Sequence, residues 1–342
     1  MSSAPGNGVL FPAVPGHSAG AVLQVRDLSV EYAMDRGTVL AVDQVSFNLD
    51  PGEFIGIVGE SGCGKSTLLF AIAKLLMPPA AITGGSVIFK GRDMVGLTDK
   101  QLAMVRWKDL SVVMQSAMNA LNPVKSIGAQ FSDAMRAHGV TGKAEIAGRS
   151  AEVLRMVGID PLHLKSYPHQ LSGGMRQRSM IAMAMLFTPE LVIMDEPTSA
   201  LDVVAQRSLM VQIKELQEEL GFAVIFVTHD MSLVSHFSDR LMVMYAGQVA
   251  ELGATRRVFD SPLHPYSIGL LDAFPSIRGP RVPLTGIPGS PPDLARIPVG
   301  CRFAARCPKV MARCTEEYPE LYRVDGTLVR CFLHAEGGAG RD

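Results

Sequence analysis

The feature that most constrains the fold is a glycine-rich segment at residues 59–66, Gly-Glu-Ser-Gly-Cys-Gly-Lys-Ser. It fits the pattern G-x-x-x-x-G-K-[ST], and it lies between an apolar run at Phe54–Val58 and a helical pattern at Thr67–Leu76. Such loops turn backbone N–H groups and a helix N-terminus towards phosphate. The strand–loop–helix setting therefore predicts a nucleotide site in an α/β fold, and a plain glycine turn with a lysine on its rim is the weaker interpretation.

The loop residues have distinct expected contributions. Glycines let the backbone fold around the phosphates, Lys65 adds a charge on the β and γ phosphates, and the Ser66 hydroxyl suits Mg²⁺. Cys63 is interpreted as a small filler and not as a nucleophile. The predicted ATP-binding positions of this segment are Gly59, Ser61, Gly62, Cys63, Gly64, Lys65, Ser66 and Thr67.

A second apolar run, Leu191–Asp195, ends in two adjacent carboxylates, Asp195 and Glu196. Asp195 is expected to hold Mg²⁺ through water, and Glu196 to polarise the water that attacks the γ-phosphate. A capping acidic pair at a strand end is the weaker alternative, because the glycine loop is present.

Gln115 closes the strand run Leu110–Met114, and His229 follows the strand run Ala223–Thr228. A lone glutamine or histidine is usually structural. Because parallel strands end at one sheet edge, we expect both side chains to share a crevice with the two carboxylates.

A second candidate phosphate-binding segment is Ser172-Gly173-Gly174, which precedes a helical pattern at Met175–Leu186. Ser172 can cap the helix, and the two glycines leave its first N–H groups accessible. Such a start is more often a plain cap. Since the first loop already serves this chain's own nucleotide, we expect the helix to serve the nucleotide of a second, similar chain.

Apolar strand runs alternate with helical patterns along the chain, which is typical of an α/β domain with a mostly parallel sheet. The expected divisions are a disordered tail at 1–20, a nucleotide-binding domain at 21–260 with an inserted helical subdomain at about 116–188, and a proline-rich C-terminal segment at 261–342. A net charge of -1 disfavours nucleic acid as a partner, and the apolar runs are far too short to cross a bilayer.

Together these motifs, in this order, resemble the nucleotide-binding subunit of an ABC transporter over residues of about 22–260. The resemblance implies a P-loop ATPase core with an added antiparallel β subdomain. It also implies a glutamine loop at Gln115, which is expected to take part in catalysis and to bind Mg²⁺ with Ser66 and Asp195. A catalytic glutamate is implied at Glu196 and a switch histidine at His229. The resemblance assigns the signature to Leu171–Gln177, which includes Gln177. A dimer-contact loop is implied at Ser199–Asp202, which ends in Asp202, and Tyr32 is implied to stack on adenine, although a tyrosine that ends a strand is often mere packing.

The blocks that begin at His264, Ile287 and Cys301 resemble the C-terminal extension of dipeptide and oligopeptide importer ATPases. The resemblance implies ATP-driven peptide import on the cytoplasmic face of the membrane, with nickel or oligosaccharide as other cargoes of the family. It implies two permease subunits, an external substrate-binding protein and a second ATPase, which we expect to be a distinct homologue. A soluble ABC ATPase is disfavoured, because such chains usually carry two such domains or a long coiled-coil insertion.

Four of the five cysteines lie in this extension with the spacing C-x5-C-x6-C-x16-C, at Cys301, Cys307, Cys314 and Cys331. A reducing cytosol disfavours disulfides, and the short C-x2-C pairs of structural zinc sites are missing. The wider spacing is compatible with a [4Fe-4S] cluster, which the resemblance also favours, with zinc second and unligated thiols last.

Overall fold

The computed structural model describes residues 20–35, 37–115, 120–198, 201–273 and 286–335. The N-terminal tail up to residue 19 and the start of the dimer-contact loop at 199–200 lie outside the described residues.

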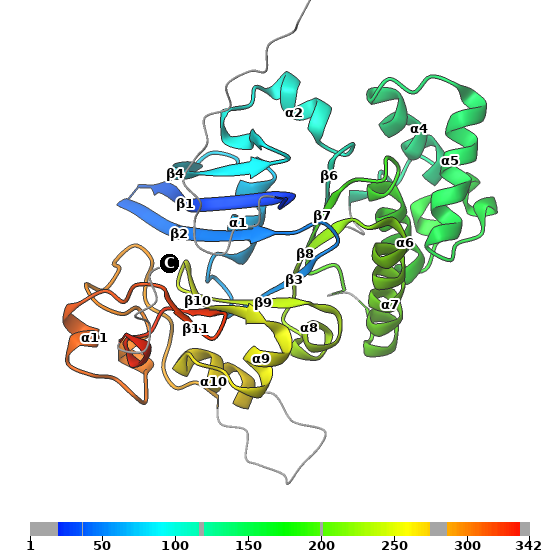
Figure 1. Cartoon of the computed structure of the whole chain (residues 1–342). Helices are drawn as coiled ribbons and strands as arrows, with labels where there is room; N and C mark the ends of the chain where they lie inside the picture. The colour runs from blue at the N-terminus through cyan, green and yellow to red at the C-terminus, as the bar shows by residue number, and fades with distance from the viewer. Residues whose placement is uncertain (1–19, 36, 116–119, 199–200, 274–285, 336–342) are drawn as a thin grey trace, which may run out of the picture.

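A sheet of eight strands forms the centre of the molecule, in the order β11-β12-β10-β9-β3-β8-β7-β6 (Figure 1). From β9 to β6 neighbouring strands are parallel, whereas β10, β12 and β11 continue the sheet antiparallel. Every residue of β3, β7 and β8 is buried, which fits their unbroken apolar sequences. The strands are β3 (Phe54–Val58), β6 (Leu110–Val113), β7 (Leu191–Asp195), β8 (Ala223–Val227), β9 (Arg240–Tyr245), β10 (Gln248–Ala254), β11 (Tyr322–Val324) and β12 (Thr327–Val329).

A second, antiparallel sheet has the order β2-β1-β4-β5. Buried and less buried residues alternate along β1, since one face of this sheet packs on the core. Its strands are β1 (Leu23–Met34), β2 (Gly37–Leu49), β4 (Ala80–Phe89) and β5 (Arg92–Asp93), followed by η1 (Met94–Gly96) and α2 (Asp99–Val105).

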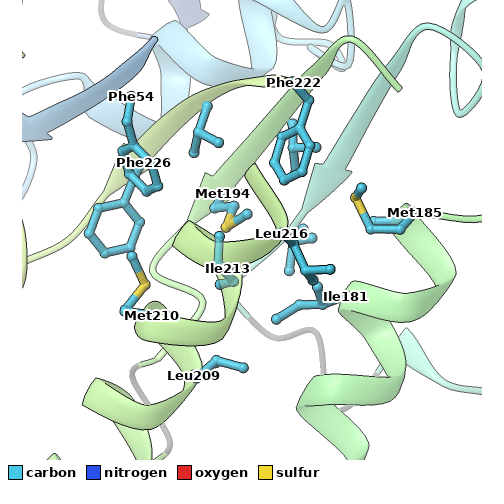
Figure 2. Packing of buried hydrophobic residues seen from close by; sticks show 14 of the residues in the cluster. Phe54, Ile181, Met185, Met194, Leu209, Met210, Ile213, Leu216, Phe222 and Phe226 are labelled. Carbon is cyan, nitrogen blue, oxygen red and sulfur yellow. The ribbon is translucent and has the colours of Figure 1, made fainter. Parts of the chain in front are cut away.

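Helices pack on the main sheet through a large apolar cluster (Figure 2). Met210 and Ile213 of α7 lie in it with Phe54 and Phe226, whose rings meet edge to face with centroids 6.0 Å apart. The helices of the core are α1 (Lys65–Ile72), α7 (Val203–Leu220) and α8 (Met231–Phe237).

Between β6 and β7, the described part of the chain is helical and stands to one side of the sheet (Figure 1). Its elements are α4 (Ile127–Ala137), α5 (Lys143–Met156), η2 (Pro161–Lys165), η3 (Pro168–Gln170) and α6 (Gly173–Ala184). Among the described residues, no helix combines the length and the apolar character that crossing a bilayer requires.

The C-terminal extension packs against the core instead of standing apart, because β12 pairs with β10 and lengthens the main sheet. Its contact with the core was not expected from the sequence. The remaining elements are α9 (Thr255–Asp260), α10 (Pro265–Asp272), η4 (Ala304–Arg306), α11 (Arg313–Glu316) and η5 (Phe332–His334).

Candidate functional site

The glycine loop follows β3, a central strand, and leads into α1. Gly59 has φ +151°, and a Cβ there would lie 2.2 Å from the Met244 carbonyl oxygen. Gly64 has φ +100°, and its Cβ would lie 2.2 Å from the Ala41 carbonyl oxygen. Only glycine fits at either position, so the tight path of the loop depends on both.

Lys65 is buried within this loop, with 5% of its surface exposed. Its Nζ donates to the carbonyl oxygens of Gly59 at 2.8 Å and Glu60 at 3.0 Å. Burial raises the pKa of the neighbouring Cys63 thiol, which keeps the thiol protonated and suits a packing role.

Asp195 and Ser66 provide the oxygen ligands expected of a magnesium site. Burial raises the pKa of the Asp195 carboxyl group, and the neighbouring Ser66 hydroxyl acts in the opposite direction by favouring the carboxylate. Within the described residues, the buried Asp195 Oδ1 has no hydrogen-bond partner. Mg²⁺ usually takes one or two carboxylates together with phosphate oxygens, so a lone buried carboxylate oxygen beside a serine hydroxyl fits it.

Glu196 directly follows β7, and its carboxylate contacts side chains that follow two other strands. Gln115 Nε2, after β6, donates to Glu196 Oε2 at 2.6 Å, and His229 Nε2, after β8, contacts Glu196 Oε1. Glu196 has φ +46°, a conformation that is rare for residues other than glycine and is often found at functional sites. The structure thus brings Gln115 and His229 into contact with Glu196, one of the two carboxylates that the sequence placed in the same crevice.

Tyr32 lies near the end of β1, and its hydroxyl is 3.1 Å from Thr67 Oγ1 in α1. This contact places the tyrosine ring beside the helix that follows the P-loop.

The signature segment begins α6, a different element from the P-loop helix (Figure 1). Ser172 Oγ accepts from the Met175 N–H at 3.2 Å, as a helix cap does. Ser172 is exposed, whereas Gln177, further along α6, is only 3% exposed. Asp202 caps α7 by accepting from the Ala205 N–H at 2.9 Å.

Two residues of the extension that the sequence reasoning missed contact the P-loop. The Glu60 N–H donates to the Tyr266 hydroxyl at 2.9 Å, and Arg306 pairs with the Glu60 carboxylate. No sequence signal marks these contacts, because 206 and 246 residues separate the partners.

The structure does not support the prediction of a metal-holding extension. Among the described residues, which include all five cysteines, no group of three or more His, Cys, Asp or Glu side chains is arranged to hold a metal ion. The same finding leaves the zinc alternative without support, since four thiolates would have to lie about 2.3 Å from one point.

The four extension thiols are nevertheless close enough to interact electrostatically. Burial raises the pKa of Cys301 and Cys307, and that of Cys331 to about 11, and the other extension thiols add to these shifts. The Cys301 N–H also donates to the Cys314 carbonyl oxygen at 2.8 Å.

Comparison with known proteins yields matches along most of the chain. A family model described as "ABC transporter" matches residues 42–199, and one described as "Oligopeptide/dipeptide transporter, C-terminal region" matches residues 250–314. The chain is 45% identical to the dipeptide transport ATP-binding protein DppD of Bacillus subtilis, over 91% of this chain and 94% of that protein. It is 43% identical to the oligopeptide transport ATP-binding protein OppD of Salmonella typhimurium, over 93% and 95%.

A solved structure is also similar, with a TM-score of 0.62 and 30% identity over 68% of this chain and 99% of that one. Its title describes a dimeric post-hydrolysis state of the ATP-binding cassette MJ0796 bound to ADP and Pi.

The fold and the site define an ATPase of the ABC class, with a P-loop, a neighbouring strand that ends in two carboxylates and a separate Ser-Gly-Gly helix. Within that class, the chain belongs to the family of ATP-binding subunits of dipeptide and oligopeptide transporters. Subunits of this family are ATPases coupled to transport, and they work with membrane permeases and an ATPase partner.

Proposed function

We propose that this chain hydrolyses ATP to power the import of dipeptides or oligopeptides through two permease subunits, which an external binding protein supplies with cargo. The observation that carries the catalytic part is the contact of Glu196 with both Gln115 and His229 beside the P-loop. The peptide cargo is supported by relatives that match the extension as well as the core. The subunit is proposed to sit on the cytoplasmic side of the membrane.

In this proposal Lys65 and the loop N–H groups bind the phosphates, and Tyr32 stacks on the adenine. Ser66 and Asp195 would hold Mg²⁺, which would supply positive charge to neutralise the phosphate oxygens. Glu196 accepts the proton of the attacking water, while Gln115 and His229 fix the orientation of its carboxylate.

The second half of each ATP site is proposed to come from a partner ATPase that packs head to tail. The exposed N-terminus of α6 has N–H groups and a helix dipole that favour phosphate, yet in the described residues no hydrogen bond joins Ser172 to this chain's own P-loop. Hydrolysis would remove the γ-phosphate that bridges the two chains and so allow them to separate. The partner is proposed to be a distinct homologue.

The cargo is tested with the complete complex, purified with its permeases and reconstituted in vesicles. We expect ATP-dependent uptake of labelled di- or oligopeptides, with loss of uptake in a Lys65→Ala variant because the phosphates lose their buried cation. Stimulation of ATP hydrolysis by nickel or an oligosaccharide, and not by peptides, would contradict the peptide assignment.

For the extension, we propose that the four neighbouring cysteines hold a [4Fe-4S] cluster. Thiolates of such a cluster bind different iron atoms and so need not converge on one point, in contrast to those around zinc. When bound, the cluster would supply a crosslink between Cys301, Cys307, Cys314 and Cys331 in a segment whose strands β11 and β12 are only three residues long.

Anaerobically purified protein is expected to contain about four iron atoms per chain and to be brown. A Cys314→Ser variant should lose iron and unfold at a lower temperature, whereas Cys63→Ser, in the P-loop, should keep its iron. Colourless protein with stoichiometric zinc, or with no metal, would refute the cluster.

A further inference from the structure

Glu60, the second residue of the P-loop, is held at three points. Its N–H donates to the Tyr266 hydroxyl at 2.9 Å, and its carbonyl oxygen accepts from Lys65 Nζ at 3.0 Å. Its carboxylate accepts two hydrogen bonds from Arg306, at 2.7 and 2.9 Å. Tyr266 and Arg306 belong to the C-terminal extension, so two of these three contacts come from outside the nucleotide-binding core.

The Arg306 guanidinium is fixed by its surroundings. Its side chain is only 5% exposed, and it donates to the carbonyl oxygens of Pro288 at 2.9 Å and Ile287 at 3.2 Å. It also donates to the Tyr245 hydroxyl at 3.2 Å. A buried guanidinium held in this way presents a fixed pair of N–H groups to one carboxylate.

A second arginine, in the turn between Cys301 and Cys307, contacts residues next to the P-loop. Arg302 donates to the Ala246 carbonyl oxygen and pairs with Asp43. The neighbouring Gly247 N–H donates to the Cys63 carbonyl oxygen in the P-loop at 3.0 Å. The turn between Cys301 and Cys307 therefore contacts the P-loop directly through Arg306 and indirectly through Arg302, which holds the residue before Gly247.

A carboxylate in this loop is unfavourable for nucleotide binding. The loop gathers N–H groups and Lys65 around phosphates, and an unpaired Glu60 would place a like charge among them. The Glu60 side chain is only 25% exposed, so solvent screens that charge incompletely. A bidentate partner removes the repulsion and fixes the direction of the carboxylate.

We propose that Arg306 is a positioning residue of the ATP site: it neutralises and orients Glu60, so that the C-terminal extension sets the affinity of the P-loop for ATP. This inference rests on the proposed function. It goes further, because it gives the extension a direct role in nucleotide binding.

The test measures binding of a fluorescent ATP analogue to the full chain and the KM and kcat of ATP hydrolysis in the complete complex. Arg306→Gln is expected to weaken ATP binding and to raise KM by about tenfold, with kcat within about twofold, because the unpaired Glu60 carboxylate would repel the phosphates when ATP binds. Glu60→Gln alone should bind within about threefold of wild type. The double variant Glu60→Gln/Arg306→Gln should recover to the same range, because no unpaired carboxylate remains.

Two further variants complete the design. Arg306→Lys keeps the charge and is expected to lose at most about threefold. Arg257→Gln is the matched control, since Arg257 pairs with Asp325 at 2.7 Å, again between the core and the extension, but outside the P-loop. It should bind ATP as wild type does.

A double variant that binds ATP no better than Arg306→Gln would overturn the inference, as would a loss in Arg306→Lys equal to that in Arg306→Gln. Thermal unfolding of each variant shows whether it is folded. Failure of the wild-type complex to hydrolyse ATP would refute the proposed function instead, and the two failures are therefore distinguishable.

Discussion

Replacing Glu196 with glutamine is expected to leave ATP bound and to lower kcat by at least about a hundredfold, the usual contribution of a general base. Glutamine has the same shape, so the contacts with Gln115 and His229 can be kept in altered form. The amide cannot accept the proton of the attacking water. Steady-state ATP hydrolysis by the complete complex, together with nucleotide binding by the variant, measures both parts of this expectation.

Glu190→Gln is the matched control. Glu190 also carries a carboxylate and directly precedes β7, but it pairs with Lys90 on the surface, away from the P-loop. It should hydrolyse ATP at the wild-type rate. Hydrolysis by Glu196→Gln within a few-fold of wild type would show that another group takes the proton. Loss of ATP binding would instead give Glu196 a role in holding the nucleotide.

The main part of this site could be predicted because it depends on strand ends. Asp195, Gln115 and His229 each lie at or just after the end of a mostly apolar run, and these runs become the parallel strands β7, β6 and β8. Parallel strands bring their C-terminal ends to one edge, so residues distant in sequence become neighbours without any long-range information.

The contacts of the extension could not be predicted in this way. Strands β11 and β12 have three residues each, too few for a period to be recognised. Arg306 lies in a single 3₁₀ turn, and its pairing with Glu60 depends on how the extension packs on the core. Gln177 is buried in this chain, and its role at a nucleotide stays a prediction.

Gly174→Asp is expected to abolish ATP hydrolysis by the complete complex while this chain's own P-loop binds ATP normally. The new carboxylate would lie at the start of α6, where the helix dipole favours negative charge, so the helix itself should fold. The partner's ATP would meet that charge. Two unit charges about 4 Å apart repel by about 4 kcal/mol near a protein surface, which corresponds to a loss of at least about a hundredfold in rate.

Two further glycine variants are controls for Gly174→Asp. One adds bulk without charge at the same position, and the other adds the same charge at a different position. In Gly174→Ala the added Cβ would lie 4.0 Å from Leu201 Cδ2, an ordinary contact, so hydrolysis should fall by no more than a few-fold. Gly148→Asp adds the same charge on α5, where a Cβ has nothing within 4 Å, and should be active. If Gly174→Asp hydrolyses ATP normally, α6 does not approach a phosphate. If it loses ATP from its own P-loop as well, the helix serves its own chain, and the head-to-tail arrangement is wrong.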